Sequence, residues 1–568
     1  MFLLLILICI SLRVRPRYVH CLLAAAVTCG GCAGMHAKNP DLVVPNSITL
    51  RTQSDVDNLR GLTAISGDLQ IGASADIVDL TPLADLESIT GSIIIAQNAS
   101  LESLAPLTGL HCSVPSVSII DNPKLVNLDG LGNLQITFNF ACRRNTELSD
   151  INNAPMMSAA INVEISGSPR LADLGGLCNL RGVKQLRISG LVSGMDFRSL
   201  GDMPNLSIMG LMNMSALNCP IELPGLQHLN TLQIREMPGL LSLDSLHGVA
   251  EIRSLELSSC PDLARIGSFQ DTLNVRSLFL MDLPKLESLD GIDALQYLEE
   301  LSIVNCSNFR DLSALTDAPK LRHLRIQNCP NLATPSLPPD MPELRSLELI
   351  RVADLRDLTG FPQLAGLEEL IISDCDSLQS IHGLPELKKL KCLSLFGLDD
   401  LNDLQGLPSM PGLQELRLTS NSGLTNLMGL PGLPQLVKLE LLHLSNLTDL
   451  NGLSAISDSL YFQIENCASL RSLDGLQHLK SCKRLGIYNC RSIQTIAGVE
   501  NLREVQDQVY IAGNDSLCDI SMLQLDGGVD RVEISNNERL DQCKTMMHMQ
   551  GWIIRKSATV KDNAPCAH

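Results

Sequence analysis

The chain has 568 residues, of which 45 % are hydrophobic and only 3 % aromatic, and its formal net charge is −19. A core built from aliphatic residues with so few aromatic ones indicates small repeated layers rather than several large globular domains. The negative charge argues against nucleic acid as a partner, because no basic face is available to contact phosphates.

Residues 1–31 have the pattern of a targeting segment. Residues 2–12 are apolar, three arginines follow, and a second apolar run of small residues covers residues 21–31. Neither run reaches the roughly 20 residues that span a bilayer. A basic region, a short apolar region and small residues at its end are typical of a signal peptide. We therefore expect export to the cell envelope or secretion.

Cys32 follows two glycines, an arrangement that resembles the lipobox of bacterial lipoproteins, in which a small residue precedes the lipidated cysteine. The resemblance implies lipidation at Cys32 and an outer-membrane or cell-surface lipoprotein. The alternative that stays open is a freely secreted protein. A lipid anchor is the only contact with a membrane that we expect.

Downstream of this segment, apolar residues recur with a 23-residue period. After Leu280 they occupy every third position, and across Leu301 and Ile303 every second position. Period two indicates a short strand, whereas period three fits turns and extended or 3₁₀ segments rather than an α-helix. We take the second apolar residue of each strand as the reference residue. Sixteen consecutive 23-residue steps connect the reference residues Ile119 and Ile487, and two coils at each end bring the prediction to about 21 coils.

Two other positions recur in the coils. Three residues after the reference, at what we call the ladder position, the backbone must turn, and its peptide groups need partners inside the stack. An Asn side chain can bond to these groups, and Cys fits as a small buried residue with a weak donor. The polar ladder residues are Asn98, Asn122, Asn145, Cys260, Cys306, Cys329, Cys375, Asn421, Cys467, Cys490, Asn514 and Asn537. Eleven residues after the reference, glycines such as Gly130 and Gly291 predict a turn with positive φ.

This order of strand, Asn or Cys and leucine resembles the leucine-rich repeat over about residues 60–540. The segments from Leu62 to Ile71 and from Asn537 to Leu540 are similar to bacterial secreted proteins and lipoproteins with receptor L-domain repeats. The many ladder cysteines depart from that subfamily. The resemblance implies one α/β-type repeat solenoid that is predominantly β. We expect parallel strands on its concave face and a thin convex side with little helix.

These patterns divide the chain into four segments. They are a targeting segment (1–31), a linker and N-terminal cap (32–60), the leucine-rich-repeat solenoid (61–540) and a C-terminal cap (541–568). Cys543 and Cys566 are similar to the cysteine pair that brackets the tail of receptor L-domain proteins. That similarity implies a disulfide pinning the cap in an oxidising compartment. Cys518 lies nearby in sequence, so the pairing stays open.

Motifs of catalysis are absent from the sequence. It contains no phosphate-binding loop, dinucleotide-binding glycine motif, nucleophile elbow or His-Glu-x-x-His, and its eleven histidines are scattered. We therefore expect no catalytic residue, no metal site and no cofactor. An enzyme with an unrecognised site is a remote alternative.

Side chains that flank the reference residue point outward, because successive strand residues alternate between faces. Opposite charges on neighbouring strands predict two ion pairs, Arg325 with Glu348 and Arg417 with Glu440. An apolar stripe accompanies them on the concave face. Its members are Phe279, Met281, Val304, Ile350, Ile371, Phe396 and Leu442.

Exposed apolar patches tend to mark interaction sites. The stripe therefore predicts that the protein binds another protein through its concave strand face, in an adhesion or receptor-like role. We expect the chain itself to be a monomer. A glycan is an alternative ligand, although few aromatic residues are available to stack on sugar rings. A different reading is a structural spacer in the envelope without a specific ligand. In that case the apolar residues only favour strands and shield one another.

Overall fold

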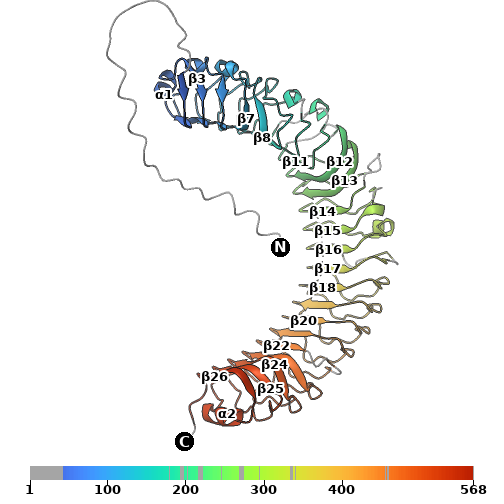
Figure 1. Cartoon of the computed structure of the whole chain (residues 1–568). Helices are drawn as coiled ribbons and strands as arrows, with labels where there is room; N and C mark the ends of the chain where they lie inside the picture. Colours follow the sequence, from blue (N-terminus) through green and yellow to red (C-terminus); the bar gives the residue numbers. More distant parts are fainter. Residues whose placement is uncertain are drawn as a thin grey trace, which may run out of the picture. The chain divides into compact units, whose positions relative to one another are not determined.

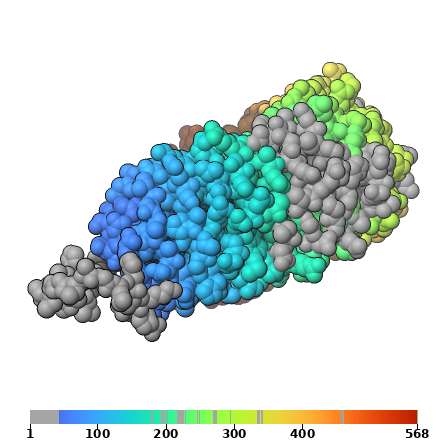
Figure 2. Space-filling model, turned by 90° about the horizontal axis from the view of Figure 1, so that it is seen from above, coloured from blue at the N-terminus to red at the C-terminus, as the bar shows by residue number. Residues whose placement is uncertain are grey.

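The computed structural model describes residues 42–566 except 178–179, 192–196, 201–202, 215–221, 245, 268–273, 293–294, 333–336, 339–340, 454–455 and 457–459. The targeting segment and Cys32 lie outside the described residues. In the described part of the chain, the coils follow one another in sequence order along a stack (Figures 1 and 2). No helix in that part is long and apolar enough to cross a membrane.

One parallel sheet runs along the stack, and each of its strands pairs with the strands before and after it. The first strand, β2, and the last, β26, are its two ends. The strands are β2 (Ile48–Leu50), β4 (Leu69–Ser74), β6 (Ile93–Asn98), β7 (Ser113–Ile120), β8 (Gln135–Arg143), β9 (Asn162–Ser166), β10 (Gln185–Ser189), β11 (Ile208–Met212), β12 (Glu222–Arg235), β13 (His247–Ser258), β14 (Ser277–Met281), β15 (Glu300–Val304), β16 (His323–Gln327), β17 (Ser346–Ile350), β18 (Glu369–Ser373), β19 (Cys392–Phe396), β20 (Glu415–Thr419), β21 (Lys438–Leu442), β22 (Tyr461–Glu465), β23 (Ser481–Tyr488), β24 (Glu504–Ala512), β25 (Gly528–Ser535) and β26 (Ile554–Lys561).

The strand register reproduces the 23-residue period. Leu280 lies opposite Ile303 and Ile303 opposite Ile326, and all three point into the core. The coils predicted from the sequence correspond to β4 and to β6 through β25. The sheet also extends past the expected solenoid boundaries, because β2 lies in the expected N-terminal cap and β26 in the expected C-terminal cap.

The remaining secondary structure is short. Three strands form a second parallel sheet at the N-terminal end: β1 (Leu42–Val44), β3 (Leu62–Ile65) and β5 (Ser88–Ile89). The return path of the coils contains 3₁₀ turns of three to five residues, namely η1 (Thr81–Leu83), η2 (Ala105–Gly109), η3 (Gly175–Leu177), η4 (Phe197–Leu200), η5 (Leu295–Tyr297) and η6 (Ser313–Asp317). Among the described residues the only α-helices are α1 (Gln53–Asp57) and α2 (Gln542–Met549). The fold is therefore a leucine-rich-repeat solenoid that is predominantly β, as the sequence predicts.

Asparagine ladders connect the coils near both ends of the sheet. Asn122 Nδ2 donates to the carbonyl of Ile95 on the preceding coil at 2.9 Å, and its Oδ1 accepts from the backbone N–H and side chain of Asn98 at 3.3 and 2.9 Å. The next residue of the ladder, Asn145, binds Asn122 in the same way. Each Asn therefore satisfies buried peptide groups of the preceding coil, which confirms the role predicted for this position.

In the central coils, ladder cysteines take the place of Asn as both donor to and acceptor from backbone groups. The Cys329 thiol lies 3.9 Å from the carbonyl oxygen of Ile303, and its sulfur accepts from the backbone N–H of Cys306. Burial raises the pKa of Cys306 to about 12 and that of Cys329 to about 11. Both are free thiols in the structure. At neutral pH they are protonated, and a protonated thiol is a poor nucleophile.

Left-handed backbone recurs just before the ladder position, two residues after the reference. Asp121, Asp282 and Arg351 all have φ between 53° and 56° there. Asn, Asp and Gly often occupy this position, which is a signal in the sequence that periodicity of apolar residues does not reveal. The glycines eleven residues after the reference have positive φ as predicted, for example 101° at Gly130. An added Cβ at Gly130 would meet the Leu104 carbonyl oxygen of the preceding coil.

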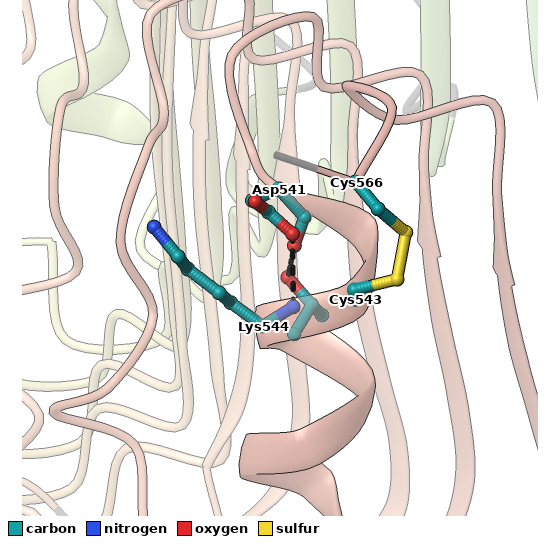
Figure 3. The surroundings of a disulfide bond; sticks show 5 residues. Asp541, Cys543, Lys544 and Cys566 are labelled. Carbon is teal, nitrogen blue, oxygen red and sulfur yellow. Dashed lines mark hydrogen bonds between the residues drawn. A yellow bond between two sulfur atoms is a disulfide. The ribbon is translucent and has the colours of Figure 1, made fainter. Parts of the chain in front are cut away.

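The C-terminal cap closes the stack with α2 and β26. Asp541 begins α2 by accepting from the backbone N–H of Lys544 at 2.9 Å, and Cys543 in its first turn forms a disulfide with Cys566 (Figure 3). Asn563 continues the ladder, because its Nδ2 donates to the Ile534 carbonyl at 2.9 Å. The side chains of β26 are mostly exposed. The last coil is thus covered by a polar strand that offers no further apolar layer.

Candidate functional site on the strand face

Each strand presents three outward positions, which form three columns along the sheet. Column 1 lies three residues before the reference, column 2 one residue before it and column 3 one residue after it. On β16 these positions are His323, Arg325 and Gln327. We call the surface made by the three columns the strand face. Most of its side chains are at least partly exposed, so packing constrains them less than the buried residues between them.

The predicted apolar residues lie on the strand face, in three groups rather than one continuous stripe. Phe279, Met281 and Val304 form the first group on β14 and β15, with Met281 45 % exposed. Arg325 and Gln327 then interrupt the row on β16, where their side chains hydrogen-bond at 2.5 Å.

The second apolar group consists of Ile350, Ile371 and Phe396 on three consecutive strands, β17 to β19, and all three side chains are half-buried. Leu442 on β21 stands apart as the third, separated from Phe396 by Thr419 on β20. No described element covers these side chains. Met281 is exposed to solvent, and the other six apolar side chains are partly exposed.

Both predicted ion pairs are present in the structure. Arg325 Nη1 lies 3.3 Å from Glu348 Oε2, and Arg417 Nε lies 3.2 Å from Glu440 Oε2. Glu440 also has Lys438 at 3.0 Å. These pairs link neighbouring strands across the gaps between the apolar groups. Because their side chains are partly exposed, each stabilises the fold by at most about 1 kcal/mol.

A tyrosine and arginine cluster extends the strand face over β22 to β24. The Arg484 guanidinium donates to the hydroxyl of Tyr461 and, at 2.7 Å, to the hydroxyl of Tyr488. The Tyr488 ring stacks on Tyr510 of the next strand, with the ring centroids 4.7 Å apart. Burial raises the pKa of Tyr488, so its hydroxyl stays protonated and can donate to a ligand. Three of the five tyrosines of the chain meet here.

The cluster depends on a glycine. Gly486 occupies column 2 of β23, and the Tyr488 ring lies over it, so that a Cβ at Gly486 would come within 2.6 Å of the ring. Because Tyr488 flanks the reference residue Ile487, strand alternation predicts that its side chain points outward, but the cluster itself was not predicted. Two signals were available, the 23-residue spacing of Tyr461 and Arg484 and the glycine that leaves room between them and Tyr510.

Metal and thiol chemistry find little support among the described residues. They contain no group of three or more His, Cys, Asp or Glu side chains that could hold a metal ion. Cys518 is exposed, whereas the ladder cysteines are buried, and burial raises the pKa of Cys375 to about 11. On the strand face itself, Cys392 in column 1 of β19 is a partly buried free thiol, and burial raises its pKa.

No family model and no curated protein sequence matches the chain. One similar solved structure is a complex of TLR13 with ssRNA13, with 15 % identity, coverage of 91 % of this chain and 83 % of that chain, and a TM-score of 0.29. Another is the mouse RP105/MD-1 complex, with 13 % identity, coverage of 89 % and 88 %, and a TM-score of 0.31. At these TM-scores the likeness supports no inference about a ligand, and the fold class rests on the repeat geometry above.

Proposed function

We propose that this protein is an exported binding module that captures a protein partner on the strand face between β14 and β24. The observation that carries the proposal is the set of apolar side chains on the solvent side of the sheet. Burying them against a partner would contribute roughly 25 cal/mol per Å² of apolar area, a gain that a spacer would not use. The module acts as a monomer, without catalysis and without a cofactor.

The composition of this surface also supports a protein partner. Tyrosine and arginine are enriched among the residues that dominate binding energies at protein interfaces, and bulky apolar residues fill the pockets around them. The cluster of Arg484 with Tyr461 and Tyr488 supplies rigid anchors, because hydrogen bonds already fix the side chains. Two predicted ion pairs lie between the apolar groups and can orient an approaching charged surface.

Capture by matched variants tests this proposal. The full chain and the double variant Ile350→Asp, Phe396→Asp would be immobilised, and proteins retained from the envelope and the surroundings of the source cells would be quantified by mass spectrometry. Two hot-spot positions cost about 2 kcal/mol each when lost, so we expect more than a tenfold loss of the specific partner. The control is Val126→Asp, Met428→Asp, which adds the same charge at two exposed apolar residues outside the strands.

The two outcomes separate a binding module from a spacer. A partner that is retained by wild type and by the control, but not by the strand-face variant, supports the proposal. A set of proteins retained equally by all three would contradict it and favour a spacer. Unfolding curves of the three proteins serve to show that each is folded, since the substituted side chains lie outside the core.

Export and lipidation are a separate part of the proposal. The targeting segment 1–31 and the two glycines before Cys32 support processing to an N-terminal lipidated Cys32. Intact mass spectrometry of the mature protein tests this directly. A diacylated Cys32 supports a lipoprotein of the outer membrane or cell surface. An unmodified N-terminus downstream of Cys32 supports secretion, and a full-length cytoplasmic chain contradicts export.

A further inference from the structure

A second part of the strand face, over β7 to β10, has a different chemistry. In column 2 of β7 and β8 lie Ser118 and Ala141, whose small side chains form the floor of a depression in the strand face. On one side, column 1 presents Asn139 and Asn162, and on the other, column 3 presents Arg143. Longer side chains around short ones leave a hollow of about 350 Å³. That volume lies at the lower end of the range for small-molecule pockets, about 300–1,000 Å³.

The lining of this hollow is polar. Amide side chains form its first wall, where Asn162 Nδ2 donates to Asn139 Oδ1 at 2.7 Å. Phe140 and Val163 also border the hollow, but their side chains are buried beneath the sheet. Ala141 is thus the one apolar side chain that the hollow presents. An apolar ligand would gain little here, whereas amides can both donate to and accept from a ligand that carries several hydroxyls.

The charges of the hollow are unbalanced. Arg143 forms an ion pair with Glu164, so their charges cancel. Arg187 lies opposite Glu164 on the next strand and lines the hollow. Among the described residues, Arg187 has no hydrogen bond or ion pair, and its side chain is exposed. One cation is left over at this position in a chain whose net charge is −19. A guanidinium with free donors fits a carboxylate in bidentate geometry.

We propose that this hollow binds a carboxylated sugar, with the carboxylate on Arg187 and the hydroxyls on Asn139, Asn162 and Glu164. The ligand class follows from three features together: a size suited to a short sugar, a wall of amides and one uncompensated guanidinium. The inference is independent of protein capture at β14 to β24. The two surfaces share the same columns and differ only in the side chains placed in them.

Titration of the full chain with sodium glucuronate tests the proposal, with glucose and sodium acetate as matched probes. Glucose has the hydroxyls without the carboxylate, and acetate has the carboxylate alone. In calorimetry or saturation-transfer NMR we expect glucuronate to bind with a dissociation constant in the millimolar range, and each of the other two at least tenfold more weakly. The affinity for glucuronate should fall with added salt, because the Arg187 contact is exposed.

Two variants locate the binding. Arg187→Gln should reduce glucuronate binding at least tenfold, to the level of glucose, and Ala141→Leu should abolish binding of both sugars by filling the floor. Arg325→Gln changes the same column position on β16, outside the hollow, and should bind glucuronate like wild type. All three substitutions are on the outward side, and equal unfolding curves would show that folding is intact.

Three results would overturn the proposal. The first is no binding of glucuronate by the wild-type chain up to tens of millimolar. The second is equal affinity for glucuronate and acetate, which would mean a bare anion site. The third is binding that Arg187→Gln and Ala141→Leu leave unchanged, which would place the sugar elsewhere on the molecule.

Discussion

The two sides of each strand differ in how far their residues repeat from coil to coil, although buried and outward residues alternate along the strand. On the inner side, β14 to β16 carry Leu280, Ile303 and Ile326 in one repeated layer. On the outer side, no two neighbouring strands there carry the same residue in column 2. The buried side is constrained by packing and by peptide groups that must find partners. The outer side is less constrained by packing, so its side chains can differ from strand to strand to suit a ligand.

This difference predicts that substitutions inside and outside the sheet separate stability from binding. A change at the ladder position should destabilise the fold and affect binding only through unfolding. A change in the outer columns should alter binding and leave the free energy of unfolding nearly unchanged. Because coils in such a stack can unfold locally, hydrogen exchange resolved by residue is the suitable measure of stability.

The largest expected effect is alkaline destabilisation of the cysteine coils. Burial raises the pKa of Cys306 to about 12 and those of Cys329 and Cys375 to about 11, against about 8.5 in an unfolded chain. Below pH 8.5 the thiols are protonated in both states and the stabilisation is complete. It is lost as pH rises toward 11–12, by roughly 2 kcal/mol per thiol at pH 10.

Hydrogen exchange at pH 8 and pH 10 would check this, after correction for the intrinsic exchange rate. The coils between Cys306 and Cys375 should lose more protection than those between Asn98 and Asn145, where Cys142 is the one buried thiol. The triple variant Cys306→Ala, Cys329→Ala, Cys375→Ala should lose this extra pH dependence. If it keeps the same dependence, the thiols are not its cause.

Asn122→Ala should have the next largest effect. The change removes the partner of the Asn98 backbone N–H and of the Ile95 carbonyl, both buried. An unsatisfied buried group costs about 1–3 kcal/mol, so we expect a loss of about 3 kcal/mol in urea unfolding or local exchange. A loss below 1 kcal/mol would mean that the ladder bonds contribute little.

Cys329→Ala, at the same position in the central coils, should cost less. A thiol is a weak donor and acceptor, and the Cys329 sulfur lies 3.9 Å from the Ile303 carbonyl oxygen. We expect a loss of about 1 kcal/mol in the same assay, from the small cavity and the weak bonds together. A loss as large as that of Asn122→Ala would contradict the distinction between Asn and Cys coils.

Arg417→Gln represents the outer side and should have the smallest effect. Of its two carboxylate partners, Glu440 keeps Lys438 at 3.0 Å and Glu415 is 38 % exposed, so no buried charge is left alone. Ion pairs of this exposure contribute about 0.2–1 kcal/mol, and we expect about 0.5 kcal/mol at low salt and less at high salt. Urea unfolding at two salt concentrations measures it. A cost above 2 kcal/mol would show that the outer columns also hold the fold together.

The buried residues of the strands and their register could be predicted from the sequence. The contacts among the outward side chains could be predicted only in part. The period of Leu280 and Ile303 fixes the register, since a slip by one residue would expose every apolar side chain. Asn563 was missed because the step from Asn537 departs from 23 residues. The Tyr488 cluster was not predicted, because the 23-residue spacing of Tyr461 and Arg484 aligns these two residues but does not show that the Tyr488 ring lies over Gly486.

Photo-crosslinking on the strand face shows whether the outer columns contact the partner. The photoreactive amino acid p-benzoylphenylalanine would replace Phe396 on β19 or, as the control, Met428 in an exposed turn. We expect the captured partner to cross-link to position 396 and not to position 428. Cross-links at position 428 with none at 396 would contradict this expectation, and would place binding on the return side of the coils.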